Sequence, residues 1–308
     1  MEKEQIKEIL GWYPTLTSAQ KKNFEKIFNY GRIGGSGKLV ILPVDQGFEH
    51  GPARSFSPNP SGYNPNYHPK LAVKSGCNAY AAPIGQLEAG IDVVEEHDLP
   101  TILKVNNHDL MMPDSKDPKP ALTSWVDDAV RLKCAAVGIT IYPGSMFAQE
   151  MYEQVRMLVE DARKAGLIVV VWSYPRGSGL ESKEAETAVD VTSYAVQIAA
   201  QLGAHIIKCK PSKNLIGIES NKKREVYKDV STETLADRTR LVMNAAFDGR
   251  RVVICSGGDV KTTDDVYEEI RQLSAGGAFG SIVGRNAFQR SEGDAIELLH
   301  NIQDIYAG

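Results

Sequence analysis

The chain has 308 residues, of which 42% are hydrophobic, and it carries a formal net charge of −4 with a pI near 5.9. This length and composition can fill a sizeable core, and the small negative charge argues against an extended nucleic-acid partner. No run of about 18 apolar residues occurs, so we expect no signal segment, no membrane contact and a cytoplasmic location.

The N-terminal part of the chain differs from the rest in its pattern. Residues 1–35 are predicted to form a helical extension, and the aromatic stretch GWYPTLT at 11–17 is predicted to pack against a neighbouring subunit. Residues 47–70 are rich in Pro, Asn, Ser and Gly and are too long for an ordinary connection. We therefore expect a lid or rim loop there.

Short apolar runs with many β-branched residues recur along the chain, separated by longer segments, such as 148–165 and 186–202, with apolar residues three and four apart. Eight such runs predict a (β/α)₈ TIM barrel over residues 36–308, within one domain spanning 1–308. A doubly wound open sheet is the alternative, but GGSGK precedes the first strand and no G-x-G-x-x-G follows it. The eight runs are KLVILPVDQG, CNAYAAPIG, TILKVNN, AAVGITIYPGS, LIVVVWSYPRG, HIIKCKPS, RVVICSGG and GSIVGRN.

The fifth run places unusual residues on one face of its strand. Side chains alternate between the two faces, so Val170, Trp172, Tyr174 and Arg176 point the same way. Aromatic and cationic side chains in succession fit a strand that rises from the core into a pocket at the carboxyl end of the barrel. We predict that this face lines a functional site.

The sixth run contains two lysines, Lys208 and Lys210, that share a face, so alternation does not distinguish them. Lys208 directly follows Ile206 and Ile207, whereas Lys210 adjoins Pro211 at the end of the run. We therefore expect Lys208 to lie deeper. Desolvation lowers the pKa of a buried lysine and leaves a nucleophilic amine, which is the group that forms a Schiff base with a ketone.

The last two runs end in small residues beside a cation, in the sequences CSGGDVKTTDD and VGRNAF. Glycine-turn amides, helix N-termini and an arginine together bind phosphate, and the loops after strands seven and eight are the usual place for such a site in this fold. We predict a phosphate site from these two ends.

Other titratable residues leave alternatives open. Lys104 shares a face with Asn106 and either tunes Lys208, binds substrate, or pairs with Asp45 or Glu88. His50 can reach the site from the long loop, although a lone loop histidine is more often solvated than catalytic. The four cysteines and the other histidines show no metal-ligand spacing, so we expect no metal, no other cofactor and no disulfide framework.

The blocks GRIGGSGKLVILPVDQGFEHGP, TIYPGS, VVWSYPRG, GAHIIKCK, SGG and VGRNAF occur in this order between about residues 31 and 290. As a set they resemble the archaeal-type class I fructose-bisphosphate aldolases. The resemblance implies a carbon–carbon lyase of glycolysis and gluconeogenesis, which reversibly cleaves fructose 1,6-bisphosphate to dihydroxyacetone phosphate and glyceraldehyde 3-phosphate. It also implies a metal-independent homo-oligomer.

The same resemblance implies roles for individual residues. Lys208 matches the Schiff-base lysine, Tyr174 the general acid and base, and Asp45 an aspartate that orients substrate hydroxyls and assists dehydration. The residues implied to contact substrate are Gln46, Trp172, Arg176 and Lys104, and, for the phosphate on C1, Ser256, Gly257, Gly258, Gly284 and Arg285.

Three alternatives share much of this pattern. One is a related Schiff-base lyase or transferase acting on another sugar phosphate, such as a shikimate-precursor synthase. The second is a thiolase-like or transaldolase-like transfer on a phosphorylated ketose. The third is a non-catalytic sugar-phosphate binding protein, against which the presence of Lys208, Tyr174 and Asp45 together argues.

Overall fold

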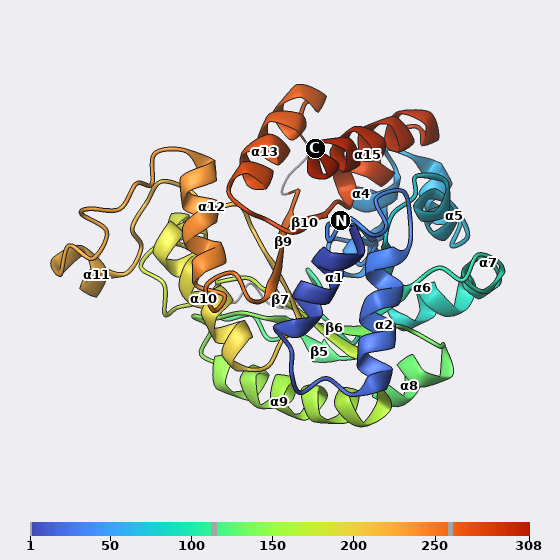
Figure 1. Cartoon of the computed structure of the whole chain (residues 1–308), viewed down its shortest axis with the longest axis horizontal. Coiled ribbons are helices and arrows are strands. Elements are labelled where there is room, and N and C mark those ends of the chain that lie inside the picture. Colours follow the sequence, from blue (N-terminus) through green and yellow to red (C-terminus); the bar gives the residue numbers. More distant parts are fainter. Residues whose placement is uncertain (1, 112–115, 258–260) are drawn as a thin grey trace.

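The computed structural model describes residues 2–111, 116–257 and 261–308, and it shows a closed barrel of eight parallel strands (Figure 1). The strand order around the barrel is β1-β10-β9-β8-β7-β6-β3-β2. This confirms the predicted barrel, with one strand for each of the eight apolar runs. The strands are β1 (Leu39–Pro43), β2 (Ala79–Ala82), β3 (Thr101–Lys104), β6 (Ala136–Ile141), β7 (Ile168–Ser173), β8 (Ile206–Cys209), β9 (Val252–Ser256) and β10 (Gly280–Ile282).

Helices between the strands surround the barrel (Figure 1). They bury one face: in α9, for example, Met151, Val155, Leu158 and Ala162 are buried at helical spacing. None of the helices in the described ranges is long and apolar enough to cross a membrane. After β2 the helices are α6 (Ile84–Ala89), α7 (Ile91–Glu96), α8 (Val126–Arg131), α9 (Ala148–Ala165), η2 (Glu184–Thr187), α10 (Val189–Gln201), α11 (Glu219–Lys223), α12 (Leu235–Asn244), α13 (Thr263–Ala275), α14 (Arg285–Phe288) and α15 (Glu292–Ala307).

The strands separate two layers of core, as expected for alternating side chains. Val169 and Val171 of β7 pack with the outer helices, whereas Val170 and Trp172 belong to the cluster inside the barrel. On β8, Ile207 packs outward in the same way. The predicted face of the fifth run therefore does point into the barrel.

The N-terminal extension forms α1 (Glu2–Gly11) and α2 (Ser18–Asn29). Thr17 caps α2 in a reciprocal pair with Gln20, and the Gln20 side chain donates to the Leu167 carbonyl oxygen at 3.0 Å. Phe24 and Phe28 are fully buried in the same cluster as the interior residues of the first halves of the strands. The extension thus closes the amino-terminal end of the barrel.

The prediction that GWYPTLT packs on a neighbouring subunit is wrong for Tyr13 and stays a prediction for the half-buried Trp12. Tyr13 is buried in its own chain, where its hydroxyl donates to the His205 carbonyl oxygen at 2.7 Å and accepts from the Val252 amide at 2.9 Å. Trp12 packs edge-on against Phe279, with ring centroids 5.6 Å apart. These aromatics seal the barrel floor because they cover strand ends that would otherwise be exposed.

The segment predicted as a lid or rim loop is at the rim but is largely helical. It forms α3 (Gln46–Glu49), α4 (Pro52–Phe56) and η1 (Pro60–Tyr63), and then enters α5 (Tyr67–Lys74). Asn59 fixes it, because its amide donates to the carbonyl oxygens of Phe288 and Arg290 at 3.0 and 2.7 Å. The prolines and small residues produce short helical turns here.

A small hairpin, absent from the sequence prediction, follows β3. Its strands are β4 (Asn106–Asn107) and β5 (Ala121–Leu122). The Asn106 amide donates to the Thr140 carbonyl oxygen at 2.8 Å, and its side-chain oxygen accepts from the Thr140 amide at 2.7 Å. This pair of bonds fixes the hairpin to β6.

Candidate active site

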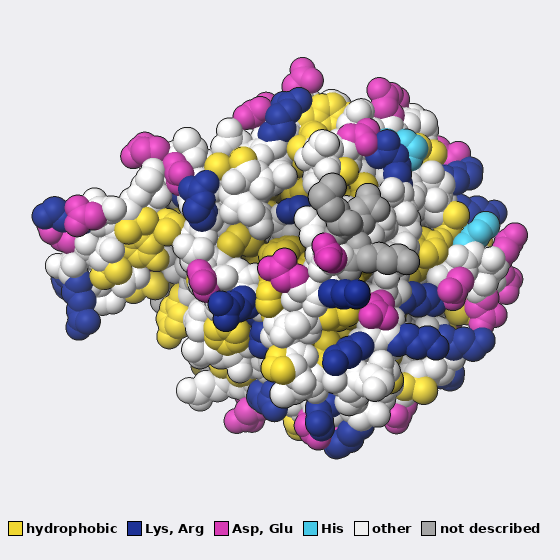
Figure 2. All heavy atoms as spheres, in the orientation of Figure 1, with side chains coloured by type: hydrophobic (Ala, Val, Ile, Leu, Met, Phe, Trp, Pro, Cys, Tyr) yellow, Lys and Arg dark blue, Asp and Glu magenta, His cyan; other side chains and the backbone are white. Residues whose placement is uncertain are grey.

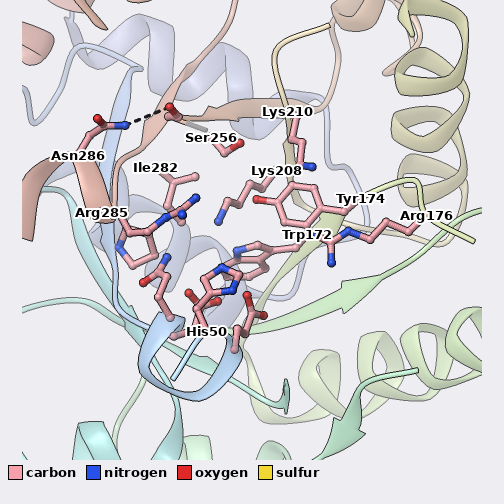
Figure 3. Close-up of a pocket in the computed structure, with 16 residues that line it drawn as sticks. His50, Trp172, Tyr174, Arg176, Lys208, Lys210, Ser256, Ile282, Arg285 and Asn286 are labelled. Carbon is pink, nitrogen blue, oxygen red and sulfur yellow. Dashed lines mark hydrogen bonds between the residues drawn. The ribbon is translucent and has the colours of Figure 1, made fainter. Parts of the chain in front are cut away.

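A cavity opens at the carboxyl ends of the strands, where the fold places its sites (Figure 3). Five strands contribute: β1 through Pro43 and Asp45, and β7, β8, β9 and β10 through the residues at their ends. The lining residues are Pro43, Asp45, Gln46, Glu49, His50, Trp172, Tyr174, Arg176, Lys208, Lys210, Ser256, Gly257, Ile282, Gly284, Arg285 and Asn286.

Lys208 lies deep in this cavity, with 5% of its surface exposed. Its Nζ is 5.2 Å from the Trp172 ring centroid and 5.5 Å from that of Tyr174. Burial lowers the pKa of Lys208 to about 8, and nearby Lys104 and Arg285 act in the same direction against Asp45 and Glu49. About a tenth of the amine is therefore uncharged and nucleophilic at pH 7, far more than for an ordinary lysine.

Lys210 lies nearer the rim, as depth along the strand predicted. Its side chain is 30% exposed, its Nζ is 3.8 Å from Glu186 Oε2, and it lies 5.8 Å from the Tyr174 ring centroid. Lys210 therefore places a partly solvated amine near the mouth of the cavity. The two lysines thus have different environments although they share a face.

Tyr174 stands beside Lys208 (Figure 3). Burial, and then the charge of Asp45, raise the pKa of its hydroxyl well above 10, while a hydrogen bond with Ser256 acts against them. The hydroxyl is therefore protonated in the resting site and is available as a proton donor.

Lys104 lies outside the cavity wall, so the structure does not support direct substrate contact by this residue. It is 1% exposed, and its Nζ donates to the Asn106 backbone oxygen and, at 3.2 Å, to Asn106 Oδ1. Its anionic neighbour is Glu49, at 3.9 Å. Neither alternative ion-pair partner contacts it, since Glu88 pairs with Arg131 at 2.6 Å on the exterior and no ion pair with Asp45 is found among the described residues.

Lys104 nevertheless influences the site. Its Nζ lies 5.7 Å from the centroid of the Trp172 ring, the same indole that Lys208 contacts. Two cations near one ring repel each other, so the Lys104 ammonium favours the uncharged form of Lys208. This agrees with the tuning role that the sequence left open for it.

Glu49 and His50 are cavity residues that sequence reasoning missed or expected to be solvated. Glu49 follows Asp45 by one helical turn, and its amide donates to the Asp45 carbonyl oxygen at 3.1 Å. Burial, reinforced by Asp45, raises the pKa of Glu49 to about 7. The signal that could have found both residues is their spacing of four from Asp45 and Gln46, had a helix been predicted at 46–49.

The predicted phosphate residues converge on one side of the cavity. Ser256, Gly257, Gly284 and Arg285 all line it, whereas Gly258 lies outside the described residues. The Asn286 amide donates to the Gly257 carbonyl oxygen at 3.2 Å and so joins the two ends (Figure 3). An arginine beside two glycine-containing turns is suited to a phosphate group.

Several polar atoms in the cavity wall lack a partner among the described residues. They are Asp45 Oδ1, Gln46 Oε1, His50 Nδ1 and Trp172 Nε1. Buried polar atoms in proteins are almost always hydrogen-bonded, so this cluster of unpaired atoms is suited to bind a polar ligand. Because the set contains both donors and acceptors, it suits a ligand with several hydroxyl groups.

The floor of the cavity depends on a close approach between two strands. Trp172 is 1% exposed, and its indole covers Gly138 of β6. A Cβ at Gly138 would lie 2.2 Å from the ring atom Cζ3 of Trp172. Glycine at 138 is thus what allows the indole to lie flat beneath the lysine.

Comparison with known proteins gives consistent results. The model of the DeoC/LacD family aldolases matches residues 39–290. The chain is 34% identical over 294 residues to "Probable fructose-bisphosphate aldolase class 1" of Chlamydia muridarum, covering 92% of this chain and 84% of that protein. Identity to "Fructose-bisphosphate aldolase class 1" of Thermoproteus tenax is 33% over 273 residues, covering 88% and 90%.

The structure is also similar to that of an archaeal fructose-1,6-bisphosphate aldolase whose catalytic lysine is covalently bound to the carbinolamine intermediate of the substrate. The TM-score is 0.74 at 30% identity, and the match covers 94% of this chain and 100% of the archaeal chain.

Proposed function

Because the chain belongs to the DeoC/LacD family of aldolases, we propose that it is a class I fructose-bisphosphate aldolase with Lys208 as its Schiff-base residue. The observation that carries this assignment is the buried Lys208 amine, with a pKa near 8, facing a tyrosine and a phosphate-binding side of the same cavity. Substrate is held by its C1 phosphate at Ser256, Gly257, Gly284 and Arg285.

The first half of the reaction forms the imine. The uncharged Lys208 amine adds to C2 of fructose 1,6-bisphosphate, and the carbonyl oxygen takes a proton to give a carbinolamine. Tyr174 then donates its proton to the C2 hydroxyl, the C–O bond breaks, and water leaves as the nitrogen lone pair forms the iminium. The protonated resting state of the Tyr174 hydroxyl supports this direction of transfer.

The second half breaks the carbon chain. The Tyr174 phenolate left by the first step removes the proton of the C4 hydroxyl, and the electrons of the C3–C4 bond move into the iminium. Glyceraldehyde 3-phosphate leaves, and the enamine takes a proton at C3 and is hydrolysed to dihydroxyacetone phosphate. The iminium withdraws electrons as a metal ion would, so this route requires no metal.

The neighbouring residues have supporting roles in this proposal. Asp45 orients the substrate hydroxyls and assists dehydration, Gln46 and Trp172 contact the sugar, and Arg176 attracts its anionic groups. The position of all four in the cavity wall supports these roles. Lys104 is assigned to tuning Lys208 from below.

The test is borohydride trapping with dihydroxyacetone phosphate in the presence of EDTA, followed by peptide mapping. We expect a covalent adduct on Lys208, which persists in Lys210→Met and is lost in Lys208→Met. An adduct on Lys210, or none in the natural protein, would contradict the mechanism.

The substrate is tested separately by comparing kcat/KM for fructose 1,6-bisphosphate and fructose 1-phosphate. We expect the bisphosphate to be cleaved faster. Trapping at Lys208 without this preference would instead identify a related Schiff-base lyase or transferase on another sugar phosphate.

The proposal extends to the setting of the enzyme. An aldolase of this class acts in glycolysis and gluconeogenesis in the cytoplasm, and the family resemblance supports a homo-oligomer. Light scattering on the purified chain measures the oligomeric state; a monomer at micromolar concentration would contradict that part.

A further inference from the structure

Asp117 lies in the connection between β4 and β5 and is not one of the residues that line the cavity. Its Oδ1 accepts three hydrogen bonds: from the Met146 amide at 2.8 Å, and from the Ser178 amide and hydroxyl at 2.9 and 3.0 Å. Met146 belongs to the loop after β6, and Ser178 belongs to the loop after β7. One carboxylate oxygen therefore joins three connections of the barrel, through hydrogen bonds that its charge strengthens.

The loops after β6 and β7 also contact each other directly. The Arg176 amide donates to the Pro143 carbonyl oxygen at 3.0 Å, and the Gly179 amide donates to the Gly144 carbonyl oxygen at 2.8 Å. Gly177 has a φ of +123°, and a Cβ at this residue would lie 2.3 Å from the Gly144 carbonyl oxygen. Because the two backbones approach this closely, the position of one loop depends on that of the other.

Arg176 is the cavity residue that these two loops hold. Its side chain lines the cavity, and its Cζ lies 5.1 Å from the centroid of the Tyr142 ring, which begins the loop after β6. Figure 3 shows Arg176 and Arg285 on opposite sides of Lys208. Since Arg285 is proposed to hold the C1 phosphate, Arg176 is placed to meet the other end of the substrate.

We propose that Asp117 is a positioning residue, which joins the loops after β6 and β7 and so holds Arg176 ready for the phosphate at the far end of the substrate. The inference rests on the proposed aldolase function. An arginine that is held in place before binding loses less side-chain entropy when a phosphate arrives. Asp117 then acts through Arg176 and not on the reacting atoms.

The test uses variants of the complete enzyme with fructose 1,6-bisphosphate and with fructose 1-phosphate, which lacks the far phosphate. Asp117→Ala removes the acceptor oxygen, whereas Asp117→Asn keeps an oxygen that can accept the same hydrogen bonds. Asp109→Ala is the matched control, because Asp109 Oδ1 accepts from the Met111 amide at 2.8 Å within the same connection.

We expect kcat/KM for the bisphosphate to fall about 5- to 20-fold in Asp117→Ala, through a higher KM at nearly unchanged kcat. The loss should be less than about twofold in Asp117→Asn and absent in Asp109→Ala. In all three variants, kcat/KM for fructose 1-phosphate should stay unchanged. A merely structural role of Asp117 would lower the values for both substrates together.

A double-mutant cycle tests whether Asp117 acts through Arg176. If it does, adding Asp117→Ala to Arg176→Met should cause no further loss of kcat/KM for the bisphosphate. Additive losses in the double variant, equal losses for the two substrates, or no loss in Asp117→Ala would each overturn the inference. Should Asp117→Ala fail to fold, Asp117→Ser takes its place in the cycle and the same outcomes decide.

The Schiff-base assay distinguishes this inference from the function on which it rests. If the natural enzyme forms no borohydride adduct with dihydroxyacetone phosphate, the aldolase function fails and the inference fails with it. If the adduct forms and the natural enzyme prefers the bisphosphate, but Asp117→Ala keeps the same preference, only the inference about Asp117 is wrong.

Discussion

Buried polar side chains at the two ends of the barrel differ in how many of their hydrogen bonds are formed within the chain. At the amino-terminal end, the Tyr13 hydroxyl both donates and accepts a hydrogen bond, and His205 Nδ1 accepts from the Val169 amide at 2.9 Å. At the carboxyl end, Asp45, Gln46, His50 and Trp172 each keep a buried atom unpaired among the described residues. The Tyr13 hydroxyl and His205 Nδ1 are paired within the chain, whereas the four cavity atoms have no partner among the described residues.

The residues that stabilise the fold and those proposed to bind substrate thus lie at opposite ends of the barrel. The hydrogen bonds of Tyr13 and the apolar closure of the floor lower the free energy of the folded state. The cavity at the other end retains desolvated and unpaired groups, including the Lys208 amine, that are costly until substrate binds. We therefore expect substitutions at the carboxyl end to lower activity without lowering stability, and substitutions at the floor to lower stability without lowering activity.

The largest effect should come from Lys208→Met. Without the amine no imine forms, so kcat/KM should fall by roughly ten-thousand-fold or more. The matched substitution Lys210→Met should lower it by only about two- to tenfold, because Lys210 acts as a rim charge. Steady-state cleavage of fructose 1,6-bisphosphate measures kcat/KM of both variants. Comparable losses in the two would contradict the assignment of Lys208, the deeper lysine, as the Schiff-base residue.

Lys208→Met should at the same time stabilise the protein. The pKa of Lys208 is about 8 when folded and near its ordinary value of 10.5 when unfolded. The unfolded state therefore holds the proton more tightly, and the resulting destabilisation is fully present below pH 8 and lost as the pH rises toward 10.5. We expect Lys208→Met to gain about 1–3 kcal/mol at pH 7, seen as a higher Tm.

Tyr174→Phe should have the next largest effect. It removes the proton donor while keeping the ring beside Lys208, so we expect kcat to fall by about 10²- to 10⁴-fold. Thermal unfolding provides the control, since the variant should fold normally. If Tyr174→Phe turns over at the rate of the natural enzyme, another group of the cavity must act as the acid and base.

The pH dependence of trapping should be smaller but diagnostic. Since the pKa of Lys208 is about 8, the rate of adduct formation should rise about tenfold between pH 7 and pH 9. Lys104→Met removes a cation that lowers this pKa, so the midpoint should move to higher pH. A rate that rises only above pH 10 would show that the amine is not activated by its surroundings.

The smallest effect on activity is expected at the floor. Tyr13→Phe leaves the His205 carbonyl and the Val252 amide without their partner, which should cost about 1–3 kcal/mol of stability while kcat/KM stays unchanged. Tyr30→Phe is the matched control, because the Tyr30 hydroxyl bonds at 3.2 Å in an exposed position. If Tyr13→Phe folds normally but loses activity, the assignment of stability to the floor and of activity to the carboxyl end is wrong.

Sequence reasoning succeeded for features that depend on the regular alternation of side chains along a strand. The eight strands, the inward face of Trp172 and Tyr174, and the greater depth of Lys208 all follow from alternation and from the order of apolar residues. These properties depend on neighbours along the chain, so they can be read from the chain. Four of the residues predicted for the phosphate, Ser256, Gly257, Gly284 and Arg285, lie together in the cavity wall, and their role stays a prediction.

The errors concern contacts between distant segments. The partner of Lys104 is Glu49, which lies on a different connection, and no local pattern links the two. Tyr13 was predicted to lie in an exposed aromatic patch because the floor that it covers is built from strand starts far along the chain. His50 was expected to be solvated because the rim segment was predicted as an open loop, when it forms short helices that direct the side chain inward.

Because Gly138 of β6 contacts Trp172 of β7, the depth of the pocket depends on the residues at both positions. Any side chain at 138 would displace the indole, whereas a smaller residue at 172 alone would open a void beneath Lys208. Because tryptophan is the largest side chain, position 172 can only be reduced, and the void then closes only if a larger residue stands at 138. A deeper or shallower pocket at this point therefore requires coordinated substitutions at 138 and 172.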